Sequence, residues 1–147
     1  MSEYLGFPKN PSRADVDAAP IARLATYNPA GVIDLVPITF AIVDDDTIVT
    51  AVDHKPKRTT QLQRLTNIRK NPNVTVLIDH YDDDWSTLWW VRARGVASVV
   101  DQPEAAFVDA LVAKYHQYRE HRPSGPTIVI NVTDVAAWSA RGAVGDY

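Results

Sequence analysis

The chain has 147 residues, of which 46% are hydrophobic, and its formal net charge is −3. This length predicts one compact domain over residues 1–147, and the negative charge argues against nucleic acid as a partner. The sequence has no cysteine, which excludes disulfides, thiolate metal sites and a cysteine nucleophile. It also lacks a long apolar run and a secretory signal pattern, so we expect a cytoplasmic protein without a membrane span.

The first third of the chain predicts an arm, a short helix and several strands. Residues 1–12 are expected to form an extended arm, and Ser12 followed by Asp15 matches the capping pattern of a helix that Pro20 keeps short. Strands are expected over residues 21–27, 33–43 and 47–51, joined by turns into a three-stranded meander. Pro37 indicates an edge, a bulge or a bend in the second of them.

The rest of the chain alternates between helix and strand patterns. A short amphipathic helix is predicted over residues 59–67, and a second helix over residues 103–115. Strands are predicted over residues 74–79, 88–100 and 127–133, with residues 135–138 as a candidate continuation. About six strands with a few short helices favour a mainly β protein that forms a closed antiparallel barrel with helices at its ends.

A basic segment follows the strand that is expected to end at residue 51. Lys55, Lys57 and Arg58 stand between this strand and the helix that begins near Thr59. Free backbone N–H groups at a helix N-terminus attract anions, and lysine and arginine side chains add donors for phosphate oxygens. Thr59 and Thr60 add hydroxyl donors. The segment is therefore a candidate phosphate site, with a solvated basic turn as the alternative.

The remaining charged clusters have more ordinary interpretations. Arg64, Arg69 and Lys70 lie on the predicted helix or at its end, where cations complement the helix dipole. Contact between these cations and an acidic cofactor tail is the alternative. His80 stands among several aspartates, but the spacing matches neither a calcium loop nor a zinc motif. We therefore predict a polar turn and no metal site.

The aromatic residues of the second half predict packing rather than chemistry. Trp85, Trp89 and Trp90 are candidates for stacking on a cofactor ring, but tryptophans in a strand usually belong to a core or an interface, and we favour a dimer interface for at least two of them. Tyr115 and Tyr118 are candidate polar tips over a pocket. The sequence contains no serine elbow, no phosphate-binding glycine loop and no paired catalytic carboxylates, so no catalytic residue is assigned.

Several of these segments, taken together, resemble one known family. They are residues 34–40 (DLVPITF), 50–58 (TAVDHKPKR), 61–62 (QL) and 71–74 (NPNV). Over roughly residues 18–138 the chain is similar to the pyridoxamine 5′-phosphate oxidase-like split β-barrel superfamily. The run 79–93 (DHYDDDWSTLWWVRA) resembles its branch of F420-dependent enzymes.

The resemblance implies a split antiparallel barrel of the FMN-binding type and a homodimer with two cofactor sites at the subunit interface. It places the cofactor phosphate at Lys55, Lys57 and Arg58. It places the ring system in a groove beside residues of two strands, closed by two tryptophans of the other subunit. The groove residues are Pro37, Ile38, Thr39, Thr50, Ala51 and Val52, and the tryptophans are Trp89 and Trp90.

Two departures from the family pattern limit what is carried over. Family members often carry histidine where Asp34 stands, and the C-terminal arginine signature of true pyridoxamine-phosphate oxidases is absent. The resemblance therefore implies an F420-dependent oxidoreductase that transfers a hydride to a small organic substrate, and not vitamin B6 chemistry. An FMN-binding oxidoreductase of the same fold and a non-catalytic F420 carrier or sensor are the alternatives.

Overall fold

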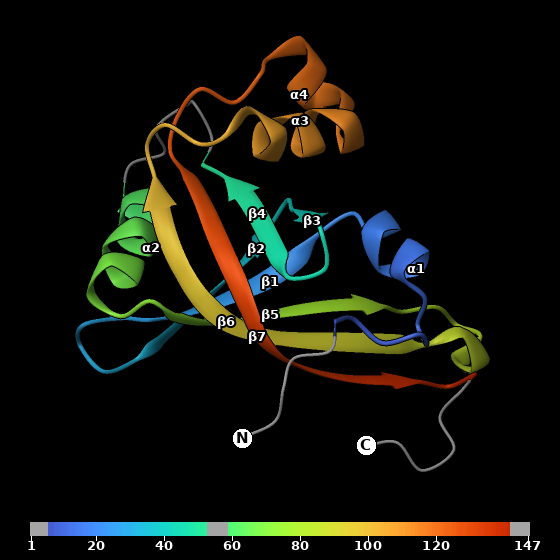
Figure 1. Cartoon of the computed structure of the whole chain (residues 1–147). Coiled ribbons are helices and arrows are strands. Elements are labelled where there is room, and N and C mark those ends of the chain that lie inside the picture. The colour runs from blue at the N-terminus through green and yellow to red at the C-terminus, as the bar shows by residue number, and fades with distance from the viewer. Residues whose placement is uncertain (1–5, 53–58, 142–147) are drawn as a thin grey trace.

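The computed structural model describes residues 6–52 and 59–141, with only the backbone for residues 59–62. Figure 1 traces the elements in chain order. They are α1 (Arg13–Ala18), β1 (Ala22–Tyr27), β2 (Ile33–Ile38), β3 (Ala41–Val43), β4 (Thr47–Ala51), α2 (Thr59–Lys70), β5 (Asn73–His80), the 3-10 turn η1 (Trp85–Thr87), β6 (Trp89–Val100), α3 (Ala105–Lys114), α4 (His116–Glu120) and β7 (Thr127–Ser139).

Most of the elements follow the sequence prediction. The capping box at the start of α1 is confirmed: the Asp15 N–H donates to Ser12 Oγ at 3.1 Å, and the Ser12 N–H donates to the Asp15 carboxylate at 3.2 Å. The predicted helix over residues 103–115 ends one residue earlier, and α4 follows after Tyr115. The candidate continuation over residues 135–138 is confirmed, because β7 runs without a break to Ser139.

The seven strands form one antiparallel sheet in the order β2-β1-β5-β6-β7-β4-β3. The two ends of this order, β2 and β3, are consecutive in the chain but do not pair with each other. The closed barrel predicted from the strand count is therefore wrong. The open sheet agrees with the split barrel that the family resemblance implies.

The predicted meander over residues 21–51 is also wrong. Residues 33–43 form two strands, separated by Thr39 and Phe40, which belong to opposite edges of the sheet. Pro37 lies on the edge strand β2 and has no N–H to offer a further strand. The Phe40 side chain is fully buried, so the chain passes through the interior at this residue as it crosses from edge strand β2 to edge strand β3.

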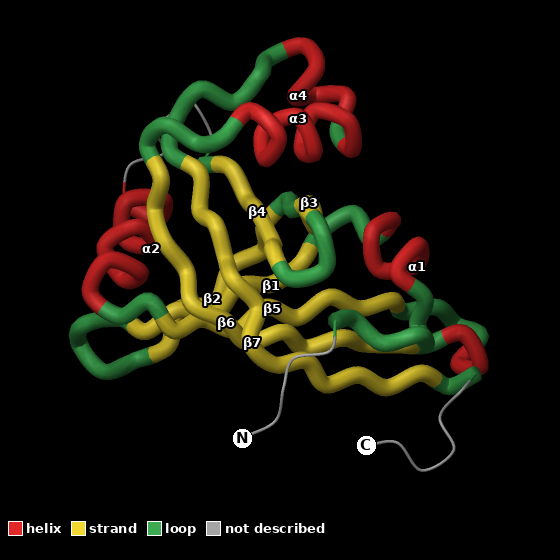
Figure 2. The backbone as a smooth tube through the Cα atoms, in the orientation of Figure 1, coloured by secondary structure: helices red, strands yellow, loops and turns green. Residues whose placement is uncertain are grey.

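Apolar layers cover both faces of the sheet. The inner face encloses the main core, to which α1 contributes Val16 and α2 contributes Leu65 and Ile68. On the outer face, Leu111 of α3 packs against Val49 of β4 and against Val129 of β7. Figure 2 shows α3 and α4 above this part of the sheet and α2 beside it.

The long strands β6 and β7 bend strongly near their middle, as Figure 2 shows. The register between them shifts at Arg94 and Gly95, which marks a β-bulge. A Cβ atom on Gly95 would collide with the Asn131 carbonyl oxygen and would lie 2.9 Å from Ile130 Cγ2. Glycine is therefore required where the two strands approach each other at the bend.

Part of the outer face carries no described helix, because α1 and α2 pack on the inner face and α3 packs on β3, β4 and β7. Side chains alternate along strands, so the residues that do not join the core share this surface. We call it the open sheet face. It includes Arg23, Ala25, Ile33, Leu35, Pro37, Leu77, Trp90, Arg92 and Trp138.

Gly95→Ala is expected to lower the free energy of unfolding by about 2 kcal/mol, because the backbone of β7 must move away from the new methyl group. Urea unfolding followed by circular dichroism measures this change. Gly125→Ala is the control, since its Cβ meets only the Val52 carbonyl oxygen, at 3.7 Å. Equal stability of the two variants would contradict the role given to Gly95.

Candidate cofactor site

The predicted phosphate segment lies outside the described residues. This holds for Lys55, Lys57 and Arg58 and for the Thr59 side chain. The described backbone does show that α2 begins at Thr59, directly after this segment. The strand-to-helix joint expected from the sequence therefore exists, while the contacts of the three cations stay predictions.

The residues of the predicted ring groove have different environments. Ile38 and Val52 belong to the main core, with exposed fractions of 4% and 7%, and Thr50 is buried as well. Only their backbone is available to a ligand. Thr39 is half-buried at the end of β2, and Pro37 is exposed on its edge. Ala51 is half-buried against the apolar cluster under α3. Thr39 and Pro37 can border a groove at the gap between β2 and β3.

Tyrosine hydroxyls hold the segment that joins β2 to β3. The Tyr118 hydroxyl lies 2.7 Å from Thr39 Oγ1. The Tyr115 hydroxyl accepts from the Phe40 N–H at 3.1 Å and donates to the Pro20 carbonyl at 2.9 Å. Burial raises the pKa of Tyr115. The sequence suggested polar tips over a pocket, and the structure shows a clamp on the gap between the two edge strands.

Lys114 packs on the same segment. Its Nζ lies 3.6 Å from the centroid of the Phe40 ring and 5.3 Å from that of Tyr115. Within the described chain this buried nitrogen has no hydrogen-bond partner. Burial lowers the pKa of Lys114 to about 8, and Asp17 opposes the shift. The Phe40 backbone and the Phe40 ring are thus held from the same helical corner.

A polar cavity of about 330 Å³ opens between α2 and the β1–β2 hairpin. It is lined by Thr26, Asn28, Asp34, Leu35, Val36, Gln63 and Arg64. Its volume lies at the lower end of the range for small-molecule sites, so it suits one part of a cofactor. The cavity adjoins the helix that follows the basic segment, which makes it a candidate extension of the phosphate site.

Amide groups fix the carboxylate of the cavity. Asn28 Nδ2 and Asn67 Nδ2 donate to Asp34 Oδ2 at 2.9 and 2.8 Å. These hydrogen bonds lower the pKa of Asp34, the Asn28 bond most. The fully buried Asn67 also donates to Thr26 Oγ1 at 2.9 Å and accepts from Gln63 Nε2 at 2.8 Å. Asp34 therefore stays ionised at neutral pH in a fixed position.

Arg64 is the cation of the cavity. Its Nε is buried and, in the described part of the chain, finds no hydrogen-bond acceptor. No ion pair joins it to Asp34 or to another described carboxylate. Burial lowers the pKa of Arg64, and Tyr118 opposes this. Arg64 nevertheless remains charged at neutral pH, because the pKa of an arginine guanidinium lies far above this range.

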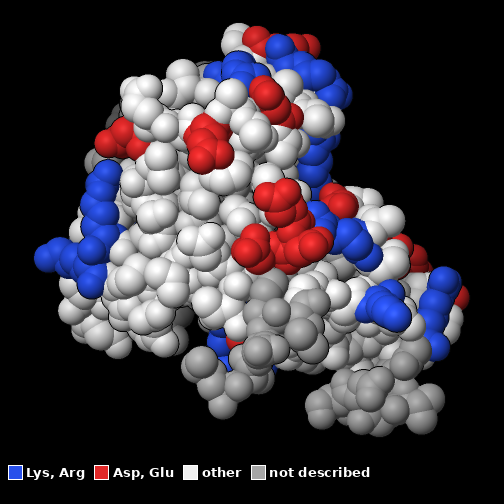
Figure 3. Space-filling model, in the orientation of Figure 1, with Lys and Arg blue, Asp and Glu red and all other residues white. Residues whose placement is uncertain are grey.

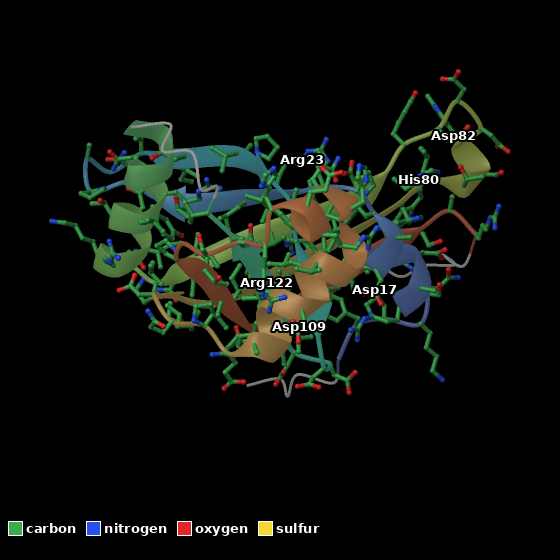
Figure 4. The ribbon with its side chains drawn as sticks, turned by 90° about the horizontal axis from the view of Figure 1, so that it is seen from above. Asp17, Arg23, His80, Asp82, Asp109 and Arg122 are labelled. Atoms are coloured by element: carbon green, nitrogen blue, oxygen red, sulfur yellow. The ribbon has the colours of Figure 1, made fainter. Side chains whose placement is uncertain are left out.

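Trp89 lies at the other end of the sheet. Its ring stacks on His80, with centroids 6.2 Å apart, beside a second cavity of about 410 Å³ that Asp79 and Asp82 also line. Figure 4 shows His80 and Asp82 at the end of the molecule opposite α2. Among the described residues, no group of three or more His, Cys, Asp or Glu side chains is arranged to hold a metal ion. Asp79 instead pairs with Arg23 at 2.6 Å.

Trp90 points to the open sheet face. It stands opposite Trp138 in the β6–β7 ladder, and the Arg92 guanidinium lies 5.9 Å from its ring centroid. The two predicted tryptophans therefore belong to different surfaces, because neighbouring residues of a strand face opposite sides. Neither lines the cavity at Arg64 within one chain, and the closing of the ring groove by these tryptophans of a second subunit stays a prediction.

A family model described as pyridoxamine 5′-phosphate oxidase matches residues 12–139, most of the chain. The protein belongs to this family. No curated protein matches the sequence. Family membership confirms the superfamily that the basic segment and its neighbouring motifs indicated.

Solved structures agree with the family assignment. A conserved hypothetical protein from Mycobacterium tuberculosis has a TM-score of 0.71 and 21% identity, covering 96% of this chain and 91% of its own. An F420 reductase has a TM-score of 0.66 and 23% identity, covering 88% and 98%. A FAD-binding protein from Mesorhizobium loti has a TM-score of 0.63 and 16% identity, covering 89% and 94%. Identities this low show a shared fold.

Sequence reasoning missed the network around Asn67. The residue lies between Leu65 and Ile68 in the predicted helix, and its polar side chain on the apolar side was the available signal. The structure shows that it connects α2 to β1 and β2 of this family member through Thr26 and Asp34. None of the described helices has the length and apolar character needed to cross a membrane.

Substitution of two buried threonines, one inside the Asn67 network and one outside it, tests whether this network stabilises the fold. Thr26→Val removes the hydroxyl that accepts from Asn67 and is expected to lower the free energy of unfolding by about 1–2 kcal/mol. Thr127→Val is the matched control, because the fully buried Thr127 Oγ1 has no partner among the described residues. It is expected to leave stability unchanged or to raise it. Urea denaturation of both variants gives the comparison, and an equal loss would contradict the network.

Proposed function

We propose that this protein binds the deazaflavin cofactor F420 and transfers a hydride between it and a small organic substrate. The observation that carries the proposal is the start of α2 at Thr59, directly after Lys57 and Arg58, in a chain of the pyridoxamine 5′-phosphate oxidase family. Backbone donors of the first helical turn and the basic side chains together suit a phosphate group. FMN is the alternative cofactor, because it also carries a ribityl phosphate.

The chain itself has to bind and orient the cofactor. When bound, the deazaflavin supplies the hydride chemistry, so no protein nucleophile is needed. The Thr39 and Tyr118 hydroxyls lie at the gap between the edge strands and would border the ring there. Arg64 of α2 supports a fit to an acidic ligand, since its Nε is buried without an acceptor among the described residues and an unsatisfied buried donor is unfavourable.

The double variant Lys57→Ala/Arg58→Ala is expected to weaken binding of F420 and of FMN about tenfold or more, because both cofactors lose charge-assisted phosphate contacts. Titration of the pure protein with each cofactor, followed by fluorescence, measures the dissociation constants. Arg69→Ala is the control, since this cation is exposed in the last turn of α2. Unchanged affinity for both cofactors in the double variant would remove the basis of the proposal.

The catalytic role is tested separately from binding. Turnover of reduced F420 with electron-poor alkene, imine or quinone acceptors supports a reductase. Tight F420 binding without turnover against that panel supports a carrier or sensor instead. A yellow protein with flavin absorbance, and a preference for FMN in the titration, supports the FMN enzyme.

We further propose a cytoplasmic homodimer that buries the open sheet face. Leu35 is 66% exposed on the edge strand β2, and Leu77 is 37% exposed on β5, diagonally across from Trp90, which stands opposite Trp138. An apolar surface of this kind on a sheet usually marks an interface. Arg92 Nε is buried there without a partner in the described chain, and a second subunit would supply one.

Leu35→Lys is expected to shift the protein from dimer to monomer, because it places a charge at an exposed apolar position of the surface that the dimer would bury. Sedimentation velocity at micromolar concentration measures the change. Val96→Lys is the control, since Val96 is 44% exposed on β6 but lies beyond the bulge. A wild-type monomer, or a Leu35→Lys dimer as stable as the wild type, would contradict this interface.

A further inference from the structure

The tip of the β1–β2 hairpin, residues 27–32, presents apolar side chains to solvent. Tyr27 is 49% exposed and Val32 is 55% exposed. The turn between them contains Pro29 and Ala30 and no charged residue. Contiguous apolar groups on a protein surface are candidates for contact with a partner, because they leave apolar area in water. We call these residues the hairpin tip.

The backbone of the hairpin tip satisfies its own hydrogen bonds. The Asn28 N–H donates to the Val32 carbonyl at 2.8 Å, and the Gly31 N–H donates to the Asn28 carbonyl at 2.9 Å. The Ala30 N–H donates to Asn28 Oδ1 at 2.9 Å, and Pro29 has no N–H. Every N–H group from Asn28 to Gly31 is therefore satisfied within the turn. This lowers the cost of moving the turn out of water, where an unsatisfied N–H is unfavourable.

Two exposed cations, Arg69 and Lys70, lie at the same end of the molecule. They belong to the last turn of α2, and Asn67 of this helix donates at 2.9 Å to Thr26, the residue before Tyr27. Figure 1 shows the loop between β1 and β2 and the end of α2 on the same side of the molecule. Within the described residues neither cation forms an ion pair. The apolar tip therefore lies beside positive charge that is not neutralised by an ion pair.

The charge of the chain is distributed unevenly between its two ends. Residues 59–78, which form α2 and most of β5, contain three cations and no aspartate or glutamate. Residues 79–84 contain four aspartates, and Figure 4 shows one of them, Asp82, at the end opposite α2. The Asp34 carboxylate lies beside α2, but it lines the cavity and is held there by two amides. An anionic surface is thus attracted to the hairpin end, although the formal net charge of the chain is −3.

We propose that the hairpin tip docks on the surface of an anionic lipid bilayer, with Tyr27 and Val32 in the headgroup region and Arg69 and Lys70 on the lipid phosphates. Tyrosine suits the membrane–water interface, and each cation close to an anionic bilayer adds to the attraction. A soluble polyanion engages the cations alone, whereas a bilayer engages the cations and the apolar turn. The proposal goes beyond the proposed function, because none of these four residues is used for the cofactor or named for the open sheet face.

Flotation of the full chain with vesicles tests the docking. Vesicles of phosphatidylcholine mixed with phosphatidylglycerol are expected to bind the wild type about tenfold or more tightly than vesicles of phosphatidylcholine alone. Arg69→Gln/Lys70→Gln is expected to weaken binding to the mixed vesicles about tenfold or more. Equal wild-type affinity for both kinds of vesicle, or no binding to the mixed vesicles, would overturn the proposal and leave the proposed function standing.

A matched variant separates a local contact from net charge. Lys9→Gln/Arg141→Gln removes the same charge from two exposed residues at the opposite end of the sheet, where Arg141 lines the cavity of about 410 Å³ and Lys9 precedes one of its lining residues. This variant is expected to keep the wild-type affinity for the mixed vesicles. A loss equal to that of Arg69→Gln/Lys70→Gln would show a response to net charge alone and would overturn the proposal.

Val32→Ser tests the apolar contact without changing the charge. It is expected to weaken binding to the mixed vesicles about threefold or more, because the side chain no longer leaves water on docking. The melting temperature is expected to stay at the wild-type value, since Val32 is exposed in the free protein. Unchanged affinity of Val32→Ser would leave the cations as the whole contact, as for a soluble polyanion, and would overturn docking on a bilayer.

The absence of cysteine allows the insertion itself to be measured. Val32→Cys and Ser86→Cys each carry one environment-sensitive fluorophore, the first at the hairpin tip and the second in η1. The label at position 32 is expected to shift its emission to the blue on the mixed vesicles, and the label at position 86 is expected to stay unchanged. No shift at position 32, or the same shift at both positions, would contradict insertion of the hairpin tip.

Discussion

The passage of the chain from β2 to β3 is the constraint on which the rest of the structure depends. The two strands form opposite edges of one sheet, and only Thr39 and Phe40 join them. A buried Phe40 needs a partner for its backbone N–H, and Tyr115 provides a hydroxyl from the end of α3. The corner of α3 and α4 therefore holds the split of the barrel at a fixed width, at the place where the predicted ring groove lies.

What the sequence predicted well is local in origin. The α1 cap depends on Ser12 and Asp15 alone, and the strand limits depend on period-two patterns and turn residues. The pairing of residues 33–43 with two different edges depends on contacts with distant parts of the chain, such as the Tyr115 hydroxyl. A β-branched run with one proline does not contain that information, so a single strand and a closed barrel were predicted instead.

The residues of the candidate site also fall into two groups, those that local sequence patterns predict and those whose role depends on the folded chain. The cationic segment at Lys57 and Arg58 and the helix start at Thr59 are visible in the sequence because charge and helix limits are local. Arg64 was assigned to the helix dipole, since its unusual feature is the lack of an acceptor in the folded chain. Figure 3 shows acidic and basic side chains interspersed over the visible face, so net charge alone would not have singled out this arginine.

The edge strand β2 connects the cavity to the open sheet face. Along this strand Asp34, Leu35 and Val36 line the cavity, and the exposed Leu35 and Pro37 also belong to the open sheet face. The strand pairs with only one neighbour, β1, so its position is set by fewer hydrogen bonds than that of a central strand. In the proposed complex, a ligand in the cavity would fix β2 from one side, and a second subunit packed on Leu35 would fix it from the other. Each event therefore reduces the freedom that the other must remove, and cofactor binding and dimerisation are expected to reinforce each other through this strand.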